Sequence, residues 1–377
     1  MSFPTAPMRS LLDAAHKAAL PEDEGNVWAL NLDQIESHSG KVLAKVMLDR
    51  NEVGPSTYVF NKGTVLYCKL RPYLNKVVVA DDDGVATTEL VPLRCDESKV
   101  LPHYLAHFLR SAAFLAFATN VVAGAKMPRM VMSEFWSYPV PLPPLEEQRR
   151  IAAILDQAET LRTQRRTALA LLDSLTQSLF LDMFGDPATN PRKWPVKRLK
   201  DLGQVITGGT PPSSKEGMFD GPIPFITPGD LESEEPVRRS VTEAGAKEVN
   251  VVRAGATLVC CIGATIGKVG IAQKDSAFNQ QLNAVVWGNH ISDNYGYEVM
   301  RFFKPTIISW GASTTLPILK KSSFEQIEIP VPPVPLQELF TDRLKHISNL
   351  KGLHKSALLG FDNLFNALQS RAFAGEP

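Results

Sequence analysis

Residues 65–77 read VLYCKLRPYLNKV and residues 257–269 read TLVCCIGATIGKV, and the two segments align without a gap. Three further matches follow in the same order: VATTEL at 85–90 with AFNQQL at 277–282, YPVP at 138–141 with IPVP at 329–332, and GDP at 185–187 with GEP at 375–377. Ordered matches of this kind indicate an internal repeat with a period of about half the chain. Each half is therefore predicted to be a mixed domain followed by a long helix.

The composition is that of a globular protein with more than one core. The chain has 377 residues, of which 44% are hydrophobic, and its 40 lysines and arginines balance 40 aspartates and glutamates. This apolar fraction excludes wholesale disorder. A protein that coats nucleic acid without specificity would carry a large basic excess. If the chain binds DNA, it must use local patches and defined contacts.

The sequence favours a reducing cytoplasm. Its most apolar stretch, residues 104–127, is interrupted by His107, Arg110, Asn120 and Lys126, which makes it a poor bilayer span. The N-terminus lacks a basic patch followed by an apolar run, so no secretory signal is visible. The four cysteines form neither a disulfide framework nor a paired metal motif.

Two long helices are predicted, one from about 144 to 184 and one from about 336 to 373. Seven-residue spacing places one row of side chains along each helix: Ile151, Ala158, Arg165, Leu172 and Leu179 in the first, and Phe340, Ile347, His354, Phe361 and Leu368 in the second. A stripe of this kind is typical of a coiled-coil seam. Because neither helix can bury its stripe alone, we expect the two to pack on each other, antiparallel if the halves are related by a pseudo-twofold axis.

Arg165 and His354 interrupt the two seams near the middle of each helix. One interpretation is that both side chains reach to solvent. The alternative is that they fix the register of the helix pair, as a lone polar residue in a seam can.

The rest of the chain is predicted to form α+β domains. Short strands are expected at 65–67, 77–80, 257–262 and 269–272, and amphipathic helices at 102–119 and 295–310. Proline clusters at 139–144 and 330–335 mark where each domain passes into its helix, because proline cannot continue a ladder or a helix. The predicted division is domain 1 at 1–143, the first helix at 144–185, domain 2 at 186–335 and the second helix at 336–377.

Familiar catalytic motifs are missing. Residues 263–268 (GATIGK) resemble a phosphate loop, but they have three residues between the glycines and Val269 where a magnesium-binding hydroxyl would stand. A strand–turn–strand explains this segment better. His103 and His107 lie one helical turn apart and could bind a metal, but with no third clustered ligand a surface or packing role is favoured. No catalytic residue, metal or cofactor is predicted in this chain.

Polar and basic residues gather in two groups that suit base edges and phosphates. Arginine and lysine suit guanine and phosphate, whereas asparagine and glutamine suit adenine. In the first half the candidates are Lys69, Arg71, Tyr73, Asn75, Lys76, Thr87, Thr88, Lys126 and Arg129. In the second half they are Thr210, Ser213, Ser214, Lys215, Lys268, Asn279, Gln280, Gln281, Ser313, Thr314, Thr315, Lys320 and Lys321. For any single residue, a hydrogen bond within its own loop is an equally good account.

Over nearly its whole length the chain resembles the DNA-specificity subunit of type I restriction-modification systems. The first helix carries the most specific motifs, VPLPPLEEQRRI at 140–151 and FLDMFGD at 180–186. The second domain adds Trp194-Pro195, GGTP at 208–211, IPFI at 223–226, the strand pair at 260–270 and FNQQ at 278–281. The resemblance implies two target-recognition domains that alternate with two long antiparallel helices.

The resemblance also implies a function and partners. A specificity subunit has no catalysis of its own and binds double-stranded DNA together with two modification subunits, which carry S-adenosylmethionine and methylate adenine at N6. Motor-nuclease subunits can join this assembly. The implied target is asymmetric, with two short specific parts around a nonspecific spacer whose length the helix pair sets.

The first domain departs from the family pattern. It has no counterpart of the GGTP loop, and if Trp28 corresponds to Trp194, it lacks about 26 residues before Cys68. The second helix opens with PLQEL and contains Gly352 and Gly360, so we expect it to be weaker or more bent. Two other classes stay open: a coiled-coil scaffold without DNA readout, and a self-contained DNA-modifying enzyme. Because no segment is strongly basic, weak DNA affinity is expected of the isolated chain.

Overall fold

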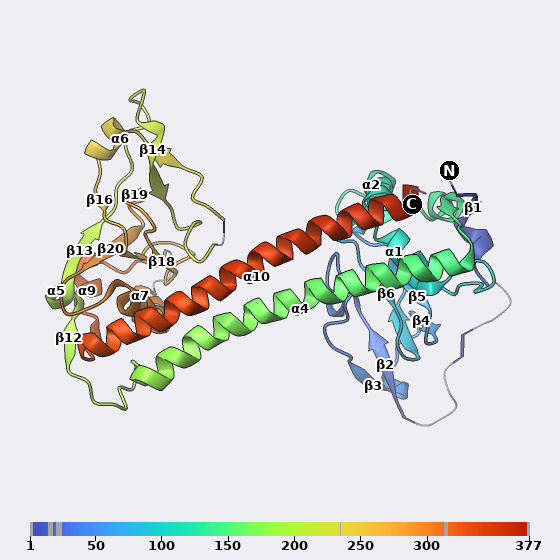
Figure 1. The fold of residues 1–377 in the computed structure, drawn as a ribbon, viewed down its shortest axis with the longest axis horizontal. Coiled ribbons are helices and arrows are strands. Elements are labelled where there is room, and N and C mark those ends of the chain that lie inside the picture. Colours follow the sequence, from blue (N-terminus) through green and yellow to red (C-terminus); the bar gives the residue numbers. More distant parts are fainter. Residues whose placement is uncertain (1–2, 14–17, 20–24, 234, 313–315, 375–377) are drawn as a thin grey trace. The chain divides into compact units, whose positions relative to one another are not determined.

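The computed structural model describes residues 3–13, 18–19, 25–233, 235–312 and 316–374, and the chain divides into two compact units. Unit 1 comprises residues 1–168 and 354–377, and unit 2 comprises residues 169–353. Each unit combines a globular α+β part with one half of each of two long helices (Figure 1). The fold is therefore mixed helix and strand, as the sequence predicts.

In unit 1, two small sheets carry the globular part. A four-stranded sheet has the order β3-β2-β7-β4, and a three-stranded sheet has the order β6-β5-β8. The elements are β1 (Thr5–Pro7), η1 (Met8–Leu11), β2 (Asn26–Leu30), η2 (Leu32–Gln34), β3 (Met47–Asp49), η3 (Arg50–Glu52), β4 (Thr57–Phe60), β5 (Val65–Cys68), η4 (Pro72–Leu74), β6 (Val77–Val79), β7 (Gly84–Thr87), β8 (Leu90–Leu93), α1 (Pro102–Leu109), α2 (Ala112–Asn120), β9 (Val122–Ala123), β10 (Arg129–Met130), α3 (Met132–Ser137) and β11 (Pro139–Pro141).

Unit 2 follows the same plan with two four-stranded sheets, in the orders β13-β20-β17-β18 and β15-β14-β19-β16. Its elements are β12 (Val196–Arg198), α5 (Leu199–Leu202), β13 (Gly203–Thr207), β14 (Phe219–Ile226), β15 (Ser240–Val241), α6 (Glu243–Lys247), β16 (Val251–Val252), β17 (Thr257–Cys260), β18 (Val269–Ile271), β19 (Ser276–Phe278), β20 (Leu282–Trp287), α7 (Asp293–Phe302), α8 (Lys304–Gly311), α9 (Lys321–Phe324) and β21 (Glu328–Pro330).

Strand register identifies which residues correspond between the units. In unit 1, Leu30 of β2 pairs with Ala86 of the parallel strand β7, and in unit 2, Ile226 of β14 pairs with Phe278 of the parallel strand β19. Trp28 therefore corresponds to a position in β14 and not to Trp194.

The counterpart of Trp194 is Phe3. Pro4 accepts a backbone hydrogen bond from Leu142 (2.8 Å), and Pro195 accepts one from Val331 (2.7 Å), so Phe3-Pro4 and Trp194-Pro195 occupy matching places. The expected loss of about 26 residues from the first domain was wrong, because it rested on the Trp28 pairing. The residues that would match the GGTP loop fall around 17–20, and two of these four lie outside the described residues.

Both expected amphipathic helices are broken into two. The first ends at Leu109, and α2 begins at Ala112 because the Ser111 hydroxyl accepts a hydrogen bond from the Phe114 amide and caps a new helix. The second ends at Phe302, and α8 restarts with Pro305 in its first turn. Continuous helices over 102–119 and 295–310 were therefore wrong predictions.

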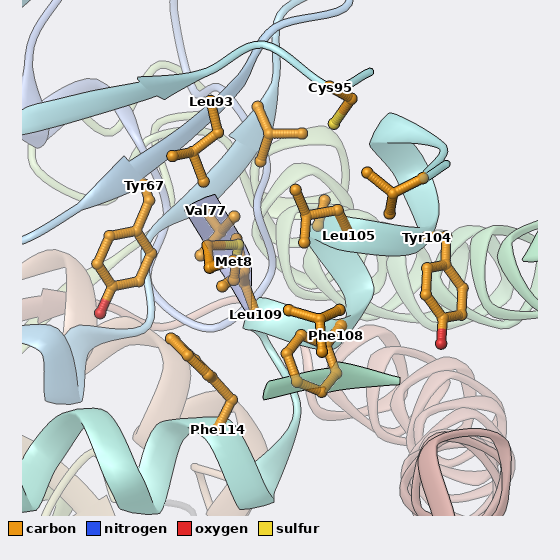
Figure 2. Close-up of a cluster of buried hydrophobic side chains, with 14 of the residues drawn as sticks. Met8, Tyr67, Val77, Leu93, Cys95, Tyr104, Leu105, Phe108, Leu109 and Phe114 are labelled. Carbon is orange, nitrogen blue, oxygen red and sulfur yellow. The ribbon is translucent and has the colours of Figure 1, made fainter. Parts of the chain in front are cut away.

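An aromatic core joins the helices of unit 1 to its three-stranded sheet. Figure 2 shows Tyr67 and Val77 from this sheet facing Leu105, Leu109 and Phe114 of α1 and α2, all 4% exposed or less. Burial of a large apolar side chain contributes about 1.5–3 kcal/mol. The same core extends onto the long helices through Ile151, Leu155, Phe365 and Leu368.

Matching hydrogen bonds tie each globular part to its helix. The Tyr104 hydroxyl donates to the Pro141 carbonyl and the Tyr295 hydroxyl to the Pro330 carbonyl, each at 2.8 Å. At the start of each long helix a buried glutamine side chain, Gln148 or Gln337, accepts the backbone N–H that precedes α1 or α7. Because these groups are buried, loss of either partner would leave the other unsatisfied.

The long helices are α4 (Leu145–Phe184) and α10 (Val334–Ala374). α10 begins two residues before the predicted start, because Pro335 is tolerated in a first helical turn. It runs unbroken through Gly352 and Gly360. Among the helices that the structure describes, none combines the length and apolar character needed to cross a bilayer.

The long helices run antiparallel within each unit. In unit 1, Arg162 of α4 pairs with Asp362 of α10 (2.6 Å), and Arg165 of α4 contacts His354 of α10. Residues later in α4 therefore contact residues earlier in α10. In unit 2, Asp173 pairs with Lys351 (2.6 Å), and Phe180 packs on Phe340.

Candidate nucleic-acid interface

In unit 1, the predicted basic segments come together at the end of β5. Leu70 forms an isolated antiparallel β-bridge with Arg129. The Arg71 N–H donates to the Pro128 carbonyl (2.7 Å), and the Met130 N–H donates to the Lys69 carbonyl (2.8 Å). The segment after β5 is thus hydrogen-bonded to the hairpin formed by β9 and β10. Residues about 60 positions apart in sequence form one polar surface.

An ion pair stabilises this junction. Arg129 donates from Nε to both oxygens of Glu89 (3.0 and 3.1 Å) and from Nη2 to Oε1 (2.7 Å). The carboxylate of Glu89 raises the pKa of the Arg129 guanidinium through this hydrogen bonding. Glu89 was not among the predicted site residues, although it lies within the repeated segment 85–90 beside Thr87 and Thr88.

Three further candidates are exposed around the ion pair. Arg71, in the left-handed region with φ 49°, precedes the short helix η4, and Tyr73, 45% exposed, lies within it. Lys126 lies in the exposed tip of the β9–β10 hairpin. Together with Lys69, which is half-buried, they give this surface a cationic character.

The remaining candidates of unit 1 are buried or half-buried. Asn75 is only 7% exposed, and its amide donates to the Arg110 carbonyl (3.1 Å), so the structure removes it from the predicted surface. Lys76 donates to the Leu32 carbonyl (2.6 Å) and is half-buried. Thr87 and Thr88 are half-buried at the end of β7.

In unit 2, the glycine-rich loop after β13 lies against the β19–β20 turn. The Gly208 N–H donates to the Leu282 carbonyl and the Gly209 N–H to the Phe278 carbonyl. A Cβ atom at Gly208 would stand 2.3 Å from the backbone oxygen of Asn279, so only glycine allows this approach. Backbone packing therefore explains the first glycine of the GGTP pattern.

This approach creates a directional chain of hydrogen bonds. The Gln281 N–H donates to Asn279 Oδ1 (2.9 Å), Asn279 Nδ2 to Thr210 Oγ1 (3.3 Å), and the Thr210 hydroxyl to Gln280 Oε1 (2.5 Å). This series of hydrogen bonds turns the carbonyl end of the exposed Gln280 side chain toward Thr210. Within the described part of the chain, neither amide hydrogen of Gln280 has a hydrogen-bond partner.

Other candidates of unit 2 differ in accessibility. Ser213 and Ser214 are exposed, and Lys215 forms an ion pair with Glu248 (2.8 Å). Lys268 is half-buried, with Nζ 3.5 Å from the Leu231 carbonyl. Lys320 is exposed, and Lys321 lies 3.6 Å from Glu325. Ser313, Thr314 and Thr315 lie outside the described residues.

The two polar surfaces occupy corresponding places with different side chains. The Lys69 N–H donates to the Glu89 carbonyl (3.0 Å), and the Cys261 N–H donates to the Gln281 carbonyl (2.9 Å), so Glu89 and Gln281 correspond. Leu70 forms an antiparallel β-bridge with Arg129, and Ile262 forms one with Ile318, so Arg129 and Ile318 also correspond. The surface of unit 1 is thus cationic, whereas that of unit 2 consists mainly of amides and hydroxyls.

Residues 263–268 form a turn between two antiparallel strands. β17 pairs with β18, Gly263 and Gly267 have positive φ, and Val269 is fully buried in β18. The strand–turn–strand prediction is confirmed. The four cysteines are free and buried, and burial raises the pKa of Cys68 to about 11 and that of Cys261 to about 12.

His107 is buried against α4, whereas the His103 side chain is 58% exposed. Both contact Asp156, His103 Nδ1 at 2.9 Å and His107 Nε2 at 2.7 Å. Burial lowers the pKa of His107, and the Asp156 hydrogen bond raises that of the more exposed His103. Within the described residues, no group of three or more histidine, cysteine, aspartate or glutamate side chains could hold a metal ion.

Comparison with known families gives a match over more than half of the chain. The model for the "Type I restriction modification DNA specificity domain" matches residues 52–170 and 191–359. The two matched regions fall one in each half of the internal repeat.

Individual relatives match over part of their length. The specificity subunit of the type I restriction enzyme EcoDI from Escherichia coli is 32% identical over 46% of this chain and 39% of the relative. The MjaIX specificity subunit from Methanocaldococcus jannaschii is 30% identical over 46% of this chain and 44% of the relative. The chain therefore spans about two fifths of the length of these relatives.

Solved structures share the fold over the full chain. A chain from a type I restriction-modification system, solved to explain complex assembly and conformational transition, has a TM-score of 0.60 at 19% identity and covers 100% of this chain and 98% of its own. The S subunit of a type I system from M. genitalium has a TM-score of 0.64 at 13% identity, with coverage of 99% and 96%. At these identities the likeness concerns the fold alone.

Proposed function

The chain belongs to the type I restriction-modification DNA specificity family, and from this premise we propose that it reads a DNA sequence on behalf of subunits that carry out the chemistry. The observation that carries the proposal is the pair of polar surfaces at corresponding places in units 1 and 2. Each is built where loops from several strands meet, and each presents groups that suit base edges and phosphates.

Because the two surfaces differ, we propose a bipartite and asymmetric target. The surface of unit 1 offers Arg71, Lys126 and Arg129, which suit guanine and phosphate. The surface of unit 2 offers Asn279 and Gln280, which suit adenine. One half-site would then require guanine and the other adenine.

The spacer between the half-sites is the second part of the proposal. We propose that α4 and α10 form one antiparallel coiled coil, related by a pseudo-twofold axis, which sets the gap between the half-sites. Forty residues of helix extend about 60 Å at 1.5 Å per residue, which exceeds the roughly 34 Å of one DNA turn. The antiparallel contacts within each unit support this arrangement.

The partners would be two modification subunits, with motor-nuclease subunits able to join them. S-adenosylmethionine would be bound by the modification subunits, which would methylate adenine at N6, and this chain would contribute no catalytic group. Exposed leucines on the long helices support a docking role: Leu171, Leu175, Leu350, Leu353, Leu359 and Leu364, between 46% and 69% exposed. We place the assembly in the cytoplasm, where the DNA lies.

Reconstitution with the modification subunits of the same system tests this function. Methylated adenines are mapped across a genome or a random-sequence library after incubation with S-adenosylmethionine. The expected result is methylation at one bipartite sequence with a fixed gap. Methylation without sequence preference would favour a scaffold without DNA readout, and methylation by this chain alone would show that it is an enzyme.

The isolated chain gives a second readout. Because its basic and acidic residues are balanced, we expect the chain alone to bind DNA weakly, with the partners enclosing the duplex. Nanomolar sequence-specific binding by the chain alone, measured at stated salt, would contradict that expectation.

A further inference from the structure

We propose that Glu89 is a positioning residue that holds the Arg129 guanidinium in the orientation that reads a guanine in the major groove. The inference rests on the proposed DNA-reading function and adds a residue that reads no base itself. It assigns the guanine requirement of one half-site to a single ion-paired arginine in unit 1.

The geometry of the ion pair leaves one edge of the guanidinium free. Glu89 occupies the edge formed by Nε and Nη2, at 2.7–3.1 Å. At the other edge, formed by Nη1 and Nη2, the one contact found among the described residues is a long one of 3.4 Å from Nη1 to the Met127 carbonyl. This edge has the two parallel N–H donors that match O6 and N7 of guanine.

Glu89 is itself held in place. Its side chain is only 20% exposed, its backbone carbonyl accepts the Lys69 N–H, and it directly precedes strand β8, whose first and last residues are buried. A carboxylate held in a hydrogen-bonded turn next to a strand restricts the rotamers of the arginine that it binds. Arginine loses considerable side-chain entropy when it is fixed, so an arginine fixed before binding loses less on contact with DNA.

The element that carries Arg129 has a shape that the major groove accepts. β9 and β10 form a two-stranded ribbon, and its tip at residues 124–127 is exposed. The major groove of B-DNA admits a two-stranded ribbon, whereas the minor groove is too narrow. Arg71 and Lys126 lie beside Arg129 and are available to phosphates.

Unit 2 has no equivalent arrangement among its described residues. Gln281 stands where Glu89 stands, and Ile318 takes the place of Arg129. The Gln281 amide instead lies 3.4 Å from the Ile262 carbonyl. The ion pair therefore distinguishes the two surfaces and predicts that only one half-site depends on it.

The test uses the complete complex with its modification subunits and a library in which each base of both half-sites is varied. The variants are Glu89→Gln, Arg129→Lys and the double variant. We expect the wild-type complex to prefer guanine at one position of one half-site. Each single variant should lower that preference roughly tenfold, the order of one bidentate contact. The double variant should lose no more, and the other half-site should be unchanged.

Lys126→Gln is the matched control, because Lys126 lies on the same hairpin. It should weaken binding to all sequences alike and reduce the salt dependence, leaving the base preference as it was. A purely structural ion pair would give a lower melting temperature and an unchanged guanine preference in Glu89→Gln, which would overturn the inference. A wild-type complex with selective half-sites but no guanine preference in either would overturn it as well. Loss of all sequence selectivity in the wild type would instead refute the proposed function.

Discussion

Arg165 Nη1 lies 3.3 Å from His354 Nδ1, and these are the two polar residues that interrupt the helix seams in the sequence. An arginine can only donate, so Nδ1 of His354 is the acceptor in this contact. The guanidinium also stands 5.9 Å from the ring centre of Phe361, within reach of a cation–π contact. Both residues lie in unit 1, and each occupies the seam position of its own helix.

The first prediction concerns this contact as a register device. Replacing both Arg165 and His354 with leucine should leave the helix pair folded, because a leucine pair suits a seam, but should allow more than one register. The measurement is the gap length in methylated targets, which should broaden. Arg149→Leu is the control, since Arg149 pairs with Glu146 on its own helix and lies near the start of α4. An unchanged single gap in the double variant would show that the two residues do not fix register.

The second prediction tests the spacer as a ruler. Insertion of four residues near Thr167 lengthens α4 by about 6 Å, or nearly two base-pair steps. The preferred gap in methylated targets should lengthen or disappear. The same four residues inserted after Gly54, which is exposed and where an added Cβ would meet none of the described residues within 4 Å, should leave the gap as it was. An unchanged gap after the helix insertion would refute the ruler.

The third prediction concerns the hydrogen-bond chain in unit 2. Thr210→Val keeps the shape of the side chain but removes the hydroxyl that orients the Gln280 amide. Preference for adenine at one position should fall roughly tenfold, the order expected for one bidentate contact. Thr210→Ser, which restores a hydroxyl, should recover most of it. Equal base profiles for the valine and serine variants would exclude a positioning role for Thr210.

The fourth prediction is a pH dependence of stability in unit 1. Burial lowers the pKa of His107 in the folded protein. As the pH falls below about 6.5, this histidine therefore takes up a proton more readily in the unfolded chain than in the folded protein. His107 therefore makes the protein less stable as pH falls. His103 acts in the opposite direction, because Asp156 raises its pKa and its contribution is lost as pH rises.

The two histidine variants should consequently change the pH dependence of stability in opposite directions. His107→Gln should lower stability at pH 7 by about 1–3 kcal/mol, through loss of its hydrogen bond to Asp156, and should flatten the loss between pH 7 and pH 5. His103→Gln should steepen that loss. Thermal unfolding of the full chain at several pH values provides the measurement, and parallel curves for the two variants would contradict this assignment.

Much of the architecture follows from local patterns. The 65–77 and 257–269 repeat predicts two similar strand pairs, and the structure has β5–β6 and β17–β18 in antiparallel register. The heptad rows predict α4 and α10 to within two residues, because a seam and flanking prolines act over a few turns of helix. The motifs at the ends of α4 also carry the resemblance to the family that the comparisons establish.

Other features depend on which distant segments meet. Trp28 and Trp194 looked equivalent as rare residues, but strand pairing assigns Phe3 to Trp194. Asn75 reads as a surface amide beside Lys76, yet the fold buries it against Arg110.

Glu89 carries no signal of its own, because its role depends on Arg129, 40 residues along the chain. Hydrophobic periodicity and the positions of proline and glycine determine local structure through neighbouring residues, so their effect can be predicted from the sequence alone. An ion pair or a buried amide is defined by loop closure between distant strands, and its chemistry exists only after the sheets have formed.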